Sequence, residues 1–389
     1  MAKKAIQRRV ARPPAAHLTW EQALAWRLGR HHLNKRAPRE AAFEVVADIG
    51  GLQAQVLSYT ELMLLARVEG IEAGFVEQAL WEERSLVKTW AMRGTLHLLP
   101  SREYPLWQAA LNTFQHYLRP FWLDYFGFTR EGLEQAMAAV AQVLDGRMLT
   151  REELAAEVTA LTGSTQIGEV LLYSSWGTTL KPAAYRGHLC FAPNQGQNVR
   201  FTRPASWLAH WQETDPDKAL PEITRRYLAA YGPATPADYG RWFGLSVAQA
   251  KAQFNGLGED VTLVAVGGRP AWLLTRHVAE IADASPNGSV QLLPGFDPYV
   301  LGAARDEPTI LDPAFKSRVY RPQGWISPVL LVNGRIAGVW QHNQKPKRVE
   351  VQIEPFSVVP EWVRPAAEVE AERLAQFLGK PLALNWQTS

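Results

Sequence analysis

Hydrophobic and polar residues follow two different periods along the chain, and the N-terminal region shows both. Residues 38–49 place apolar side chains at the spacing of one helical face, and a double glycine then ends the helix. An earlier helix is expected to begin after Thr19, because Gln22 follows at the spacing of a capping box. Residues 85–100 instead contain two β-rich runs, which predict a hairpin around Arg93 and Gly94.

Helical periodicity followed by two β-rich runs occurs twice more farther along the chain. Residues 129–144 have helical periodicity, and residues 150–153 form a second capping box. Two short runs around the turn NQGQN at 194–198 then predict strands. Residues 221–254 are helical again, and they lead into a hairpin about the glycines at 267–268.

Helices followed by a β-hairpin, three times in succession, match the plan of a winged helix, in which three short helices form a core and the hairpin covers its open side. We therefore predict an α+β fold of three tandem winged-helix units, followed by a strand-rich segment with a closing helix. The absence of glycine-rich or proline-rich linkers favours one compact body. The predicted bounds are 18–100, 101–217 and 218–284 for the three units and 285–389 for the C-terminal segment.

The composition is typical of a globular protein, and the net charge is compatible with a nucleic-acid partner. Hydrophobic residues make up 47% of the 389 positions and charged residues 20%, which is ordinary for a soluble domain. The net charge of +3 permits a nucleic-acid partner without demanding one. Residues 1–17 are basic and contain no acid, so we expect a disordered arm that is either a solvated tail or a contact to phosphates.

The chain lacks the motifs of most cofactor enzymes. The phosphate-binding loop, the dinucleotide fingerprint and the nucleophile elbow are absent, and no histidines have the spacing of metal ligands. His31 and His32 are adjacent and point apart, so we assign them to a solvated face or to a helix C-terminus. Cys190, the single cysteine, excludes an internal disulfide and is expected in the core. We therefore expect neither a metal nor a cofactor.

No apolar stretch reaches the roughly 20 residues of a membrane span, so we expect no membrane partner and a cytoplasmic location.

The candidate site is GLQAQ at residues 51–55, where two glutamines flank one alanine in apolar surroundings. Amides are poor acids and poor bases, but each both donates and accepts hydrogen bonds. Gln53 and Gln55 therefore either satisfy backbone groups between two helices or hold a small molecule in place. The residues alone leave both interpretations open.

Four motifs in order carry a resemblance to a known family: GLQAQ at 51–55, KTWAMRGTLHLLP at 88–100, LLPGFDPYVLG at 292–302 and NGRIAGVW at 333–340. With them the chain resembles the tandem winged-helix DNA glycosylases of the AlkZ and YcaQ type, known for azinomycin resistance and repair of interstrand crosslinks. The family motif is Gln–apolar–Gln or Gln–apolar–Asp, and it maps onto Gln53, Ala54 and Gln55. With an amide in both places the chain resembles the AlkZ branch, although Ala54 is smaller than the usual middle residue. The resemblance implies a C-shaped body around duplex DNA.

It also implies a monofunctional DNA glycosylase that excises N-alkylated purines, crosslinked ones included. A purine alkylated at N7 already carries positive charge, so it leaves the sugar without a strong general acid, and the enzyme has only to place a water beneath C1′. We assign this role to Gln53 and Gln55. The expected partner is duplex DNA with alkylated or crosslinked purines, bound by a monomer associated with the nucleoid.

Expected DNA contacts lie at or beside predicted turns: Arg93, His97, Arg186, Arg269, Arg335, Lys345, Lys347 and Arg348. The alternative for Arg93 is a solvated turn, and for His97 a hydrogen bond at the edge of the core. Asp297 is either a site carboxylate or the cap of a turn. Trp90 and Trp340 either stack on bases or pack in the core.

Two other functions remain open from the residues. A winged-helix regulator or architectural protein would bind DNA by sequence and release no base. A resistance protein that sequesters a DNA-alkylating drug would bind the drug without DNA, in an aromatic pocket. Neither function requires paired amides.

Overall fold

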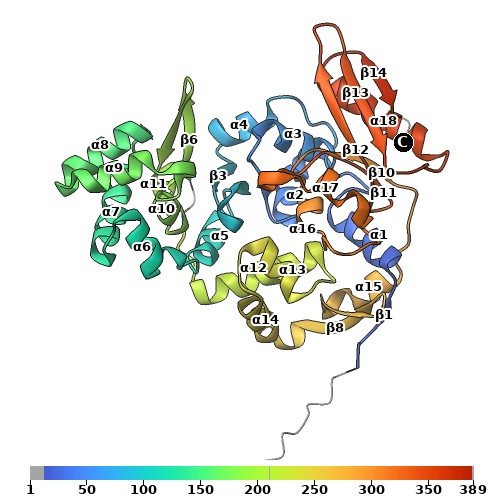
Figure 1. Cartoon of the computed structure of the whole chain (residues 1–389), viewed down its shortest axis with the longest axis horizontal. Helices are drawn as coiled ribbons and strands as arrows, with labels where there is room; N and C mark the ends of the chain where they lie inside the picture. Colours follow the sequence, from blue (N-terminus) through green and yellow to red (C-terminus); the bar gives the residue numbers. More distant parts are fainter. Residues whose placement is uncertain (1–12, 210, 388–389) are drawn as a thin grey trace, which may run out of the picture.

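The chain folds into three similar units and a C-terminal sheet, and a computed structural model describes residues 13–209 and 211–387. Figure 1 shows unit 1 in blue and cyan at the centre, with unit 2 in green on one side and unit 3 in yellow below. The C-terminal sheet, in orange and red, lies on the other side of unit 1. Helices and sheets are combined in one body, which confirms the predicted α+β class.

Unit 1 consists of four helices and a three-stranded antiparallel sheet. The Thr19 hydroxyl accepts from the backbone N–H of Gln22, and the Gln22 side chain accepts from that of Thr19, so the predicted capping box starts the first helix. In the sheet, the last strand lies between the other two. The elements are α1 (Trp20–Arg30), α2 (Ala42–Asp48), β2 (Leu52–Gln53), α3 (Leu57–Leu65), α4 (Phe75–Trp81), β3 (Leu86–Trp90) and β4 (Leu96–Pro100).

Unit 2 repeats this plan with more helices. The capping box predicted at Thr150 and Glu153 is present, and the strands around the NQGQN turn form the expected hairpin. The last strand is again in the middle of the sheet, in the order β5-β7-β6. The elements are α5 (Tyr104–Leu111), α6 (Pro120–Phe126), α7 (Arg130–Val143), β5 (Leu149–Thr150), α8 (Arg151–Thr162), α9 (Thr165–Tyr173), α10 (Lys181–Tyr185), β6 (Cys190–Gln195), β7 (Asn198–Thr202) and α11 (Pro204–Trp207).

Unit 3 has the same strand order, with a single bridge in place of its first strand. Ala234 lies between the first two helices and pairs with Trp272 in the last strand of the unit. That last strand also pairs with the strand that precedes it along the chain, so it lies in the middle. All three units therefore share the strand connectivity of a winged helix. The elements are α12 (Pro216–Tyr231), α13 (Pro236–Phe243), α14 (Val247–Gly256), β8 (Val261–Val266), β9 (Arg269–Leu274) and α15 (Val278–Ala282).

The N-terminal residues correct one expectation. Residues 1–12 of the predicted basic arm lie outside the described part of the chain. His17, also assigned to that arm, lies in β1 (His17–Leu18), which pairs in parallel with β8. The free edge of β8 accounts for this, because it offers unpaired backbone groups that a passing segment can satisfy.

The C-terminal segment forms a five-stranded sheet in the order β10-β11-β12-β13-β14. The Asn333–Gly334 turn joins two of the strands, and the closing helix buries a stripe of small and apolar residues against the sheet. The last strand pairs in parallel with β13 and was not predicted. The elements are β10 (Val290–Leu293), α16 (Pro298–Gly302), α17 (Lys316–Val319), β11 (Val329–Val332), β12 (Arg335–Gln344), β13 (Val349–Pro355), α18 (Val363–Phe377) and β14 (Leu382–Trp386).

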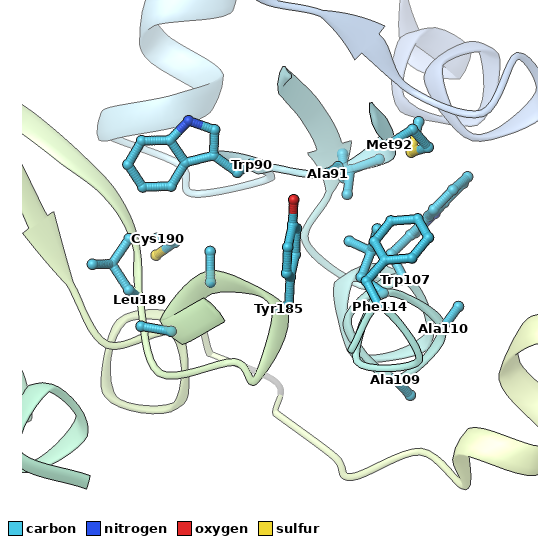
Figure 2. Close-up of a cluster of buried hydrophobic side chains, with 14 of the residues drawn as sticks. Trp90, Ala91, Met92, Trp107, Ala109, Ala110, Phe114, Tyr185, Leu189 and Cys190 are labelled. Atoms are coloured by element: carbon cyan, nitrogen blue, oxygen red, sulfur yellow. The ribbon is translucent and has the colours of Figure 1, made fainter. Parts of the chain in front are cut away.

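One hydrophobic cluster extends from the first hairpin of unit 1 through units 2 and 3, while the helices of unit 1 pack in a second cluster with residues of the C-terminal segment. Figure 2 shows Trp90 from unit 1 near Tyr185 and Cys190 of unit 2, with Trp107 of α5 and Phe114, just after α5, on the far side of Tyr185. Cys190 is buried, as expected, and the same cluster continues into α12 and α13. The units are therefore packed against one another rather than strung on linkers.

The core also decides the roles of the two tryptophans, and of the two interpretations of His31 it rules out the solvated face and leaves the helix C-terminus. Trp90 and Trp340 are both buried, so core packing holds for each. His31 is not solvated: it is fully buried at the end of α1, edge-on to the rings of Tyr231 and Tyr299. Burial lowers the pKa of His31 well below its usual value, since a charged imidazole would lose its hydration there.

Candidate active site

The two glutamines lie on a short strand that enters the sheet of unit 1 and then leaves it. Gln53 ends β2 and is only 5% exposed. The backbone N–H of Ala54 donates to the carbonyl of Leu96 at 2.7 Å, which holds the motif against β4. Gln55 follows in an exposed bend immediately before α3. The motif therefore has one enclosed amide and one accessible amide.

His97 lies directly opposite Gln53 in the antiparallel ladder, so both side chains are on the same face of the sheet. Its Nδ1 is 3.0 Å from the carbonyl oxygen of Thr95. A carbonyl only accepts, so Nδ1 carries the proton and Nε2 is left as an acceptor. Burial, with a contribution from nearby Arg93, lowers the pKa of His97 to about 3, and the ring is neutral at physiological pH.

Arg93 points into the protein from the turn of the first hairpin. Its backbone has a φ of 58°, in the left-handed region. Nη2 donates to Oε1 of Gln53 at 2.9 Å, and Nη1 donates to the carbonyl of Trp242 in α13. Burial lowers the pKa of Arg93 to about 10, so it stays charged at neutral pH. Both guanidinium bonds are directed inward, and the expected contact of the partly exposed Arg93 with DNA stays a prediction.

Unit 3 packs tightly on the turn that precedes the motif. Gly50 and Gly51 both have positive φ, and a Cβ at Gly50 would lie 2.8 Å from the Trp242 ring. The hydroxyl of Tyr231, at the end of α12, donates to the carbonyl of Ile49 at 2.7 Å. The position of Gln53 thus depends on contacts between two units.

Asp297 is a structural group and not a free site carboxylate. Its side chain accepts from the backbone N–H of Tyr299, which confirms the predicted cap. It also receives two hydrogen bonds from Arg67, at 2.7 and 2.8 Å, and both side chains are fully buried. Sequence reasoning missed Arg67, because nothing around it along the chain marks a buried cation.

The isolated arginines on the predicted list are engaged in ion pairs. Arg186 makes a bidentate pair with Glu134 at 2.6 and 2.7 Å, and its side chain is 15% exposed. Arg269 pairs with Glu307 and Arg335 with Glu21, although both arginines stay exposed. Arg186 is therefore poorly placed for a phosphate, whereas exposed Arg269 and Arg335 keep that expectation open.

The basic turn at 345–348 joins β12 to β13 and is exposed throughout. Lys345 and Arg348 both lie near the carboxylate of Glu350, at 3.9 and 2.6 Å. Lys347 has no carboxylate partner among the described residues. Of the predicted contacts in this turn, Lys347 is the cation most available to a phosphate.

Within residues 13–209 and 211–387, no three histidine, cysteine, aspartate or glutamate side chains gather as a metal site would require. In the same residues, no helix combines the length and apolarity needed to cross a bilayer.

Comparisons with known proteins show which family the chain resembles along its length. The model of the family described as "DNA glycosylase AlkZ-like" matches residues 46–377, which include Gln53 and Gln55. A protein of Streptomyces sahachiroi named "Interstrand DNA cross-link repair glycosylase" is 39% identical over 367 residues, covering 93% of this chain and 97% of its own. The solved structure of Streptomyces sahachiroi DNA glycosylase AlkZ matches with a TM-score of 0.85 at 36% identity, covering 95% of this chain and all of that one.

Proposed function

The chain belongs to the AlkZ-like family of DNA glycosylases, and we propose that it hydrolyses the N-glycosidic bond of purines alkylated at N7, without a lyase step. One observation carries this proposal. Gln53 and His97 face the same side of one sheet, with Gln55 exposed beside them, and none of the three is charged at neutral pH. Three uncharged polar side chains suit a reaction in which the enzyme positions a water molecule and supplies no strong acid.

The reaction begins with a leaving group that is already cationic. When the C1′–N9 bond breaks, its electron pair neutralises the purine, and positive charge develops on the sugar. A water held next to C1′ then bonds to that carbon, and its proton passes to solvent. Hydrogen bonds to amides and to neutral His97 can orient this water at any physiological pH.

The placement of Lys88 supports hydrolysis without a lyase step. A lyase step requires an amine nucleophile beside C1′. Lys88 is the lysine of the β3–β4 hairpin and lies opposite Leu98, one position from the Thr89–His97 pair. Since successive side chains alternate between faces, Lys88 is on the other face of the sheet from Gln53.

We extend the proposal to N7-linked interstrand crosslinks. The relative from Streptomyces sahachiroi is named for crosslink repair, and the likeness covers nearly the full length of both chains. The exposed position of Gln55 supports this extension, because a bulky adduct has direct access to that side of the motif.

The test is release of 7-methylguanine from an alkylated duplex in EDTA, under single-turnover conditions. We expect wild type to release the base. We expect Gln53→Ala and Gln55→Ala to lose about 100-fold or more in rate while they keep duplex affinity, because a misplaced water slows the chemistry and not the binding. Gln142→Ala, an exposed glutamine of α7, is the matched control. A wild type that binds every alkylated duplex offered and releases no base would refute the proposal.

The same assay separates the two other functions. A regulator would show sequence-preferring binding, no base release and indifference to both glutamine substitutions. A sequestering protein would bind the drug in the absence of DNA, which isothermal titration detects directly.

A further inference from the structure

The bond between Arg93 and Gln53 makes the two amides of the motif chemically unequal. A guanidinium has only donors, so the group of Gln53 that faces Arg93 must be its oxygen. The amide is planar, and its Nε2 therefore points the other way. This NH2 group has no partner among the described residues and is not fully enclosed by them. Toward the open side of the site, Gln53 is a donor.

The complementary acceptors lie on the neighbouring residues. His97 offers Nε2, since its Nδ1–H is committed to the Thr95 carbonyl. Gln55 is exposed, and its amide has no side-chain or backbone partner in the described part of the chain, so it is free to turn its oxygen toward a water. A water at this site would accept from Gln53 and donate to Gln55 or His97.

We propose that Arg93 is a positioning residue, which fixes Gln53 as the donor to the hydrolytic water and leaves Gln55 as the acceptor. This inference rests on the proposed function and deepens it. Arg93 acts through Gln53 and needs no contact with DNA.

Two further features suit Arg93 to this role. No carboxylate among the described residues pairs with it, so its positive charge is directed at the Gln53 oxygen and the Trp242 carbonyl. A hydrogen bond from a charged donor polarises the amide and strengthens the donor at its other end. The turn itself is confined by unit 3, because a Cβ at Gly244 would lie 3.3 Å from the backbone nitrogen of Arg93.

The first experiment compares Arg93→Gln with wild type, each with Gln53 intact and with Gln53→Ala. We expect Arg93→Gln to release 7-methylguanine about 10- to 100-fold more slowly under single-turnover conditions, with duplex affinity within about twofold. In the Gln53→Ala background the same change should cost nothing more, since the residue through which Arg93 acts is gone. Arg225→Gln, an arginine of α12 paired at the surface, is the matched control.

Additive losses would overturn the inference, because they would show that Arg93 acts independently of Gln53. A loss of affinity that accounts for the loss of rate would also overturn it and would identify Arg93 as a DNA contact. Wild-type rates for Arg93→Gln would overturn it as well. If wild type itself releases no base, the proposed function fails and not merely the role of Arg93.

The second experiment exchanges the two amides for carboxylates and does not depend on the folding of an Arg93 variant. Gln53→Glu keeps the bond with Arg93 and removes the donor, so it should be about as slow as Gln53→Ala. Gln55→Glu keeps an acceptor and should retain a rate within about tenfold of wild type. Equal losses for the two glutamates, or greater activity for Gln53→Glu, would show the donor and acceptor roles to be wrong.

Discussion

Gln53 and His97 each make one side-chain hydrogen bond that determines what the other end of the side chain can do. Arg93 occupies the oxygen of Gln53, and the Thr95 carbonyl occupies Nδ1 of His97. What remains is a donor on Gln53 and an acceptor on His97, neither of which depends on protonation near neutral pH. The chemistry at this scale is placement of water by uncharged groups.

A flat pH profile follows from this arrangement. His97 has a pKa of about 3 and Arg93 a pKa of about 10, so both keep one protonation state between about pH 6 and 9. We expect the single-turnover rate of base release to change by less than about threefold over that range at constant ionic strength. Spontaneous depurination without enzyme is subtracted at each pH. A bell-shaped profile centred near neutrality would show that an acid or base takes part.

The burial of His31 predicts sensitivity to acid. Its pKa is lowered in the folded protein, so below about pH 6.5 the unfolded chain binds a proton that the folded chain does not. The free energy of unfolding should therefore decrease as the pH is lowered below about 6.5, by up to about 1.4 kcal/mol per pH unit for this one group. We expect His31→Phe to flatten the dependence of Tm on pH between about 5 and 7. The exposed His17→Phe serves as the control, and equal slopes for wild type and His31→Phe would contradict the prediction.

At the scale of elements, the short strand β2 aligns Gln53 with His97. It is two residues long, and the paired glycines just before it allow the chain to turn sharply out of α2. Because so short a strand makes only two residue pairs, its register depends on close contact with β4. Disturbance of that contact should reach Gln53 directly.

Gly51→Ala tests this dependence. Gly51 has a φ of 92°, and a Cβ there would lie 2.7 Å from Cδ2 of Leu99 and 3.0 Å from the carbonyl oxygen of Leu98. We expect a loss of about 1–3 kcal/mol in the free energy of unfolding and a slower release of base as β2 shifts. Gly74→Ala is a matched control, because Gly74 has a similar φ of 91° with open space around it. Equal effects on base release would assign the loss to backbone strain alone.

At the scale of the whole molecule, polar bonds buried between units hold the site together. Arg93 joins the first hairpin to α13, and Arg67 joins the segment after α3 to Asp297 ahead of α16. These bonds cross the boundaries that the sequence predicts between units. The site is consequently a property of the assembled body and not of unit 1 alone.

The Arg67–Asp297 pair should be costly to break from one side. Arg67→Met leaves a carboxylate buried without its counter-ion, and we expect a loss of about 3–5 kcal/mol in urea unfolding. The double variant Arg67→Met, Asp297→Asn should recover part of that loss, because it buries no unpaired charge. Arg318→Met, which breaks a partly exposed pair with Glu354, should cost less than about 1 kcal/mol. A double variant no more stable than Arg67→Met would show that charge is not the source of the loss.

At the scale of the whole molecule we also predict that the basic turn at 345–348 contacts DNA. Lys347 has no carboxylate near it in the described residues, whereas Arg348 is held by Glu350. We expect Lys347→Gln to reduce the salt dependence of duplex binding by about one unit in the slope of log K against log salt. Arg348→Gln should reduce it less. Unchanged slopes for both variants would place the DNA elsewhere.

Local features of the chain were accessible from the sequence. The capping boxes at Thr19 and Thr150, the hairpins around Arg93 and Gly267, and the turn at Asp297 follow from residues within a few positions of one another. Their physical basis is local backbone preference and short-range hydrogen bonding, and the order of these elements was enough to predict repeated winged-helix units.

Long-range pairings required the folded protein. β1 and β14 each occupy the edge of a sheet formed far away in sequence, and their short runs carry no periodicity that predicts a strand. The burial of His31 depends on two tyrosines more than a hundred residues distant.

The sequence by itself determined which residues form the candidate motif, since Gln53 and Gln55 are adjacent to a turn that its glycines specify. Only the tertiary structure decided what each amide can do. Arg93 lies 40 positions from Gln53, and Trp242, which accepts its other bond, lies 149 positions from Arg93. A side chain's free donor or acceptor is what remains after its partners are satisfied, and those partners are brought together by packing.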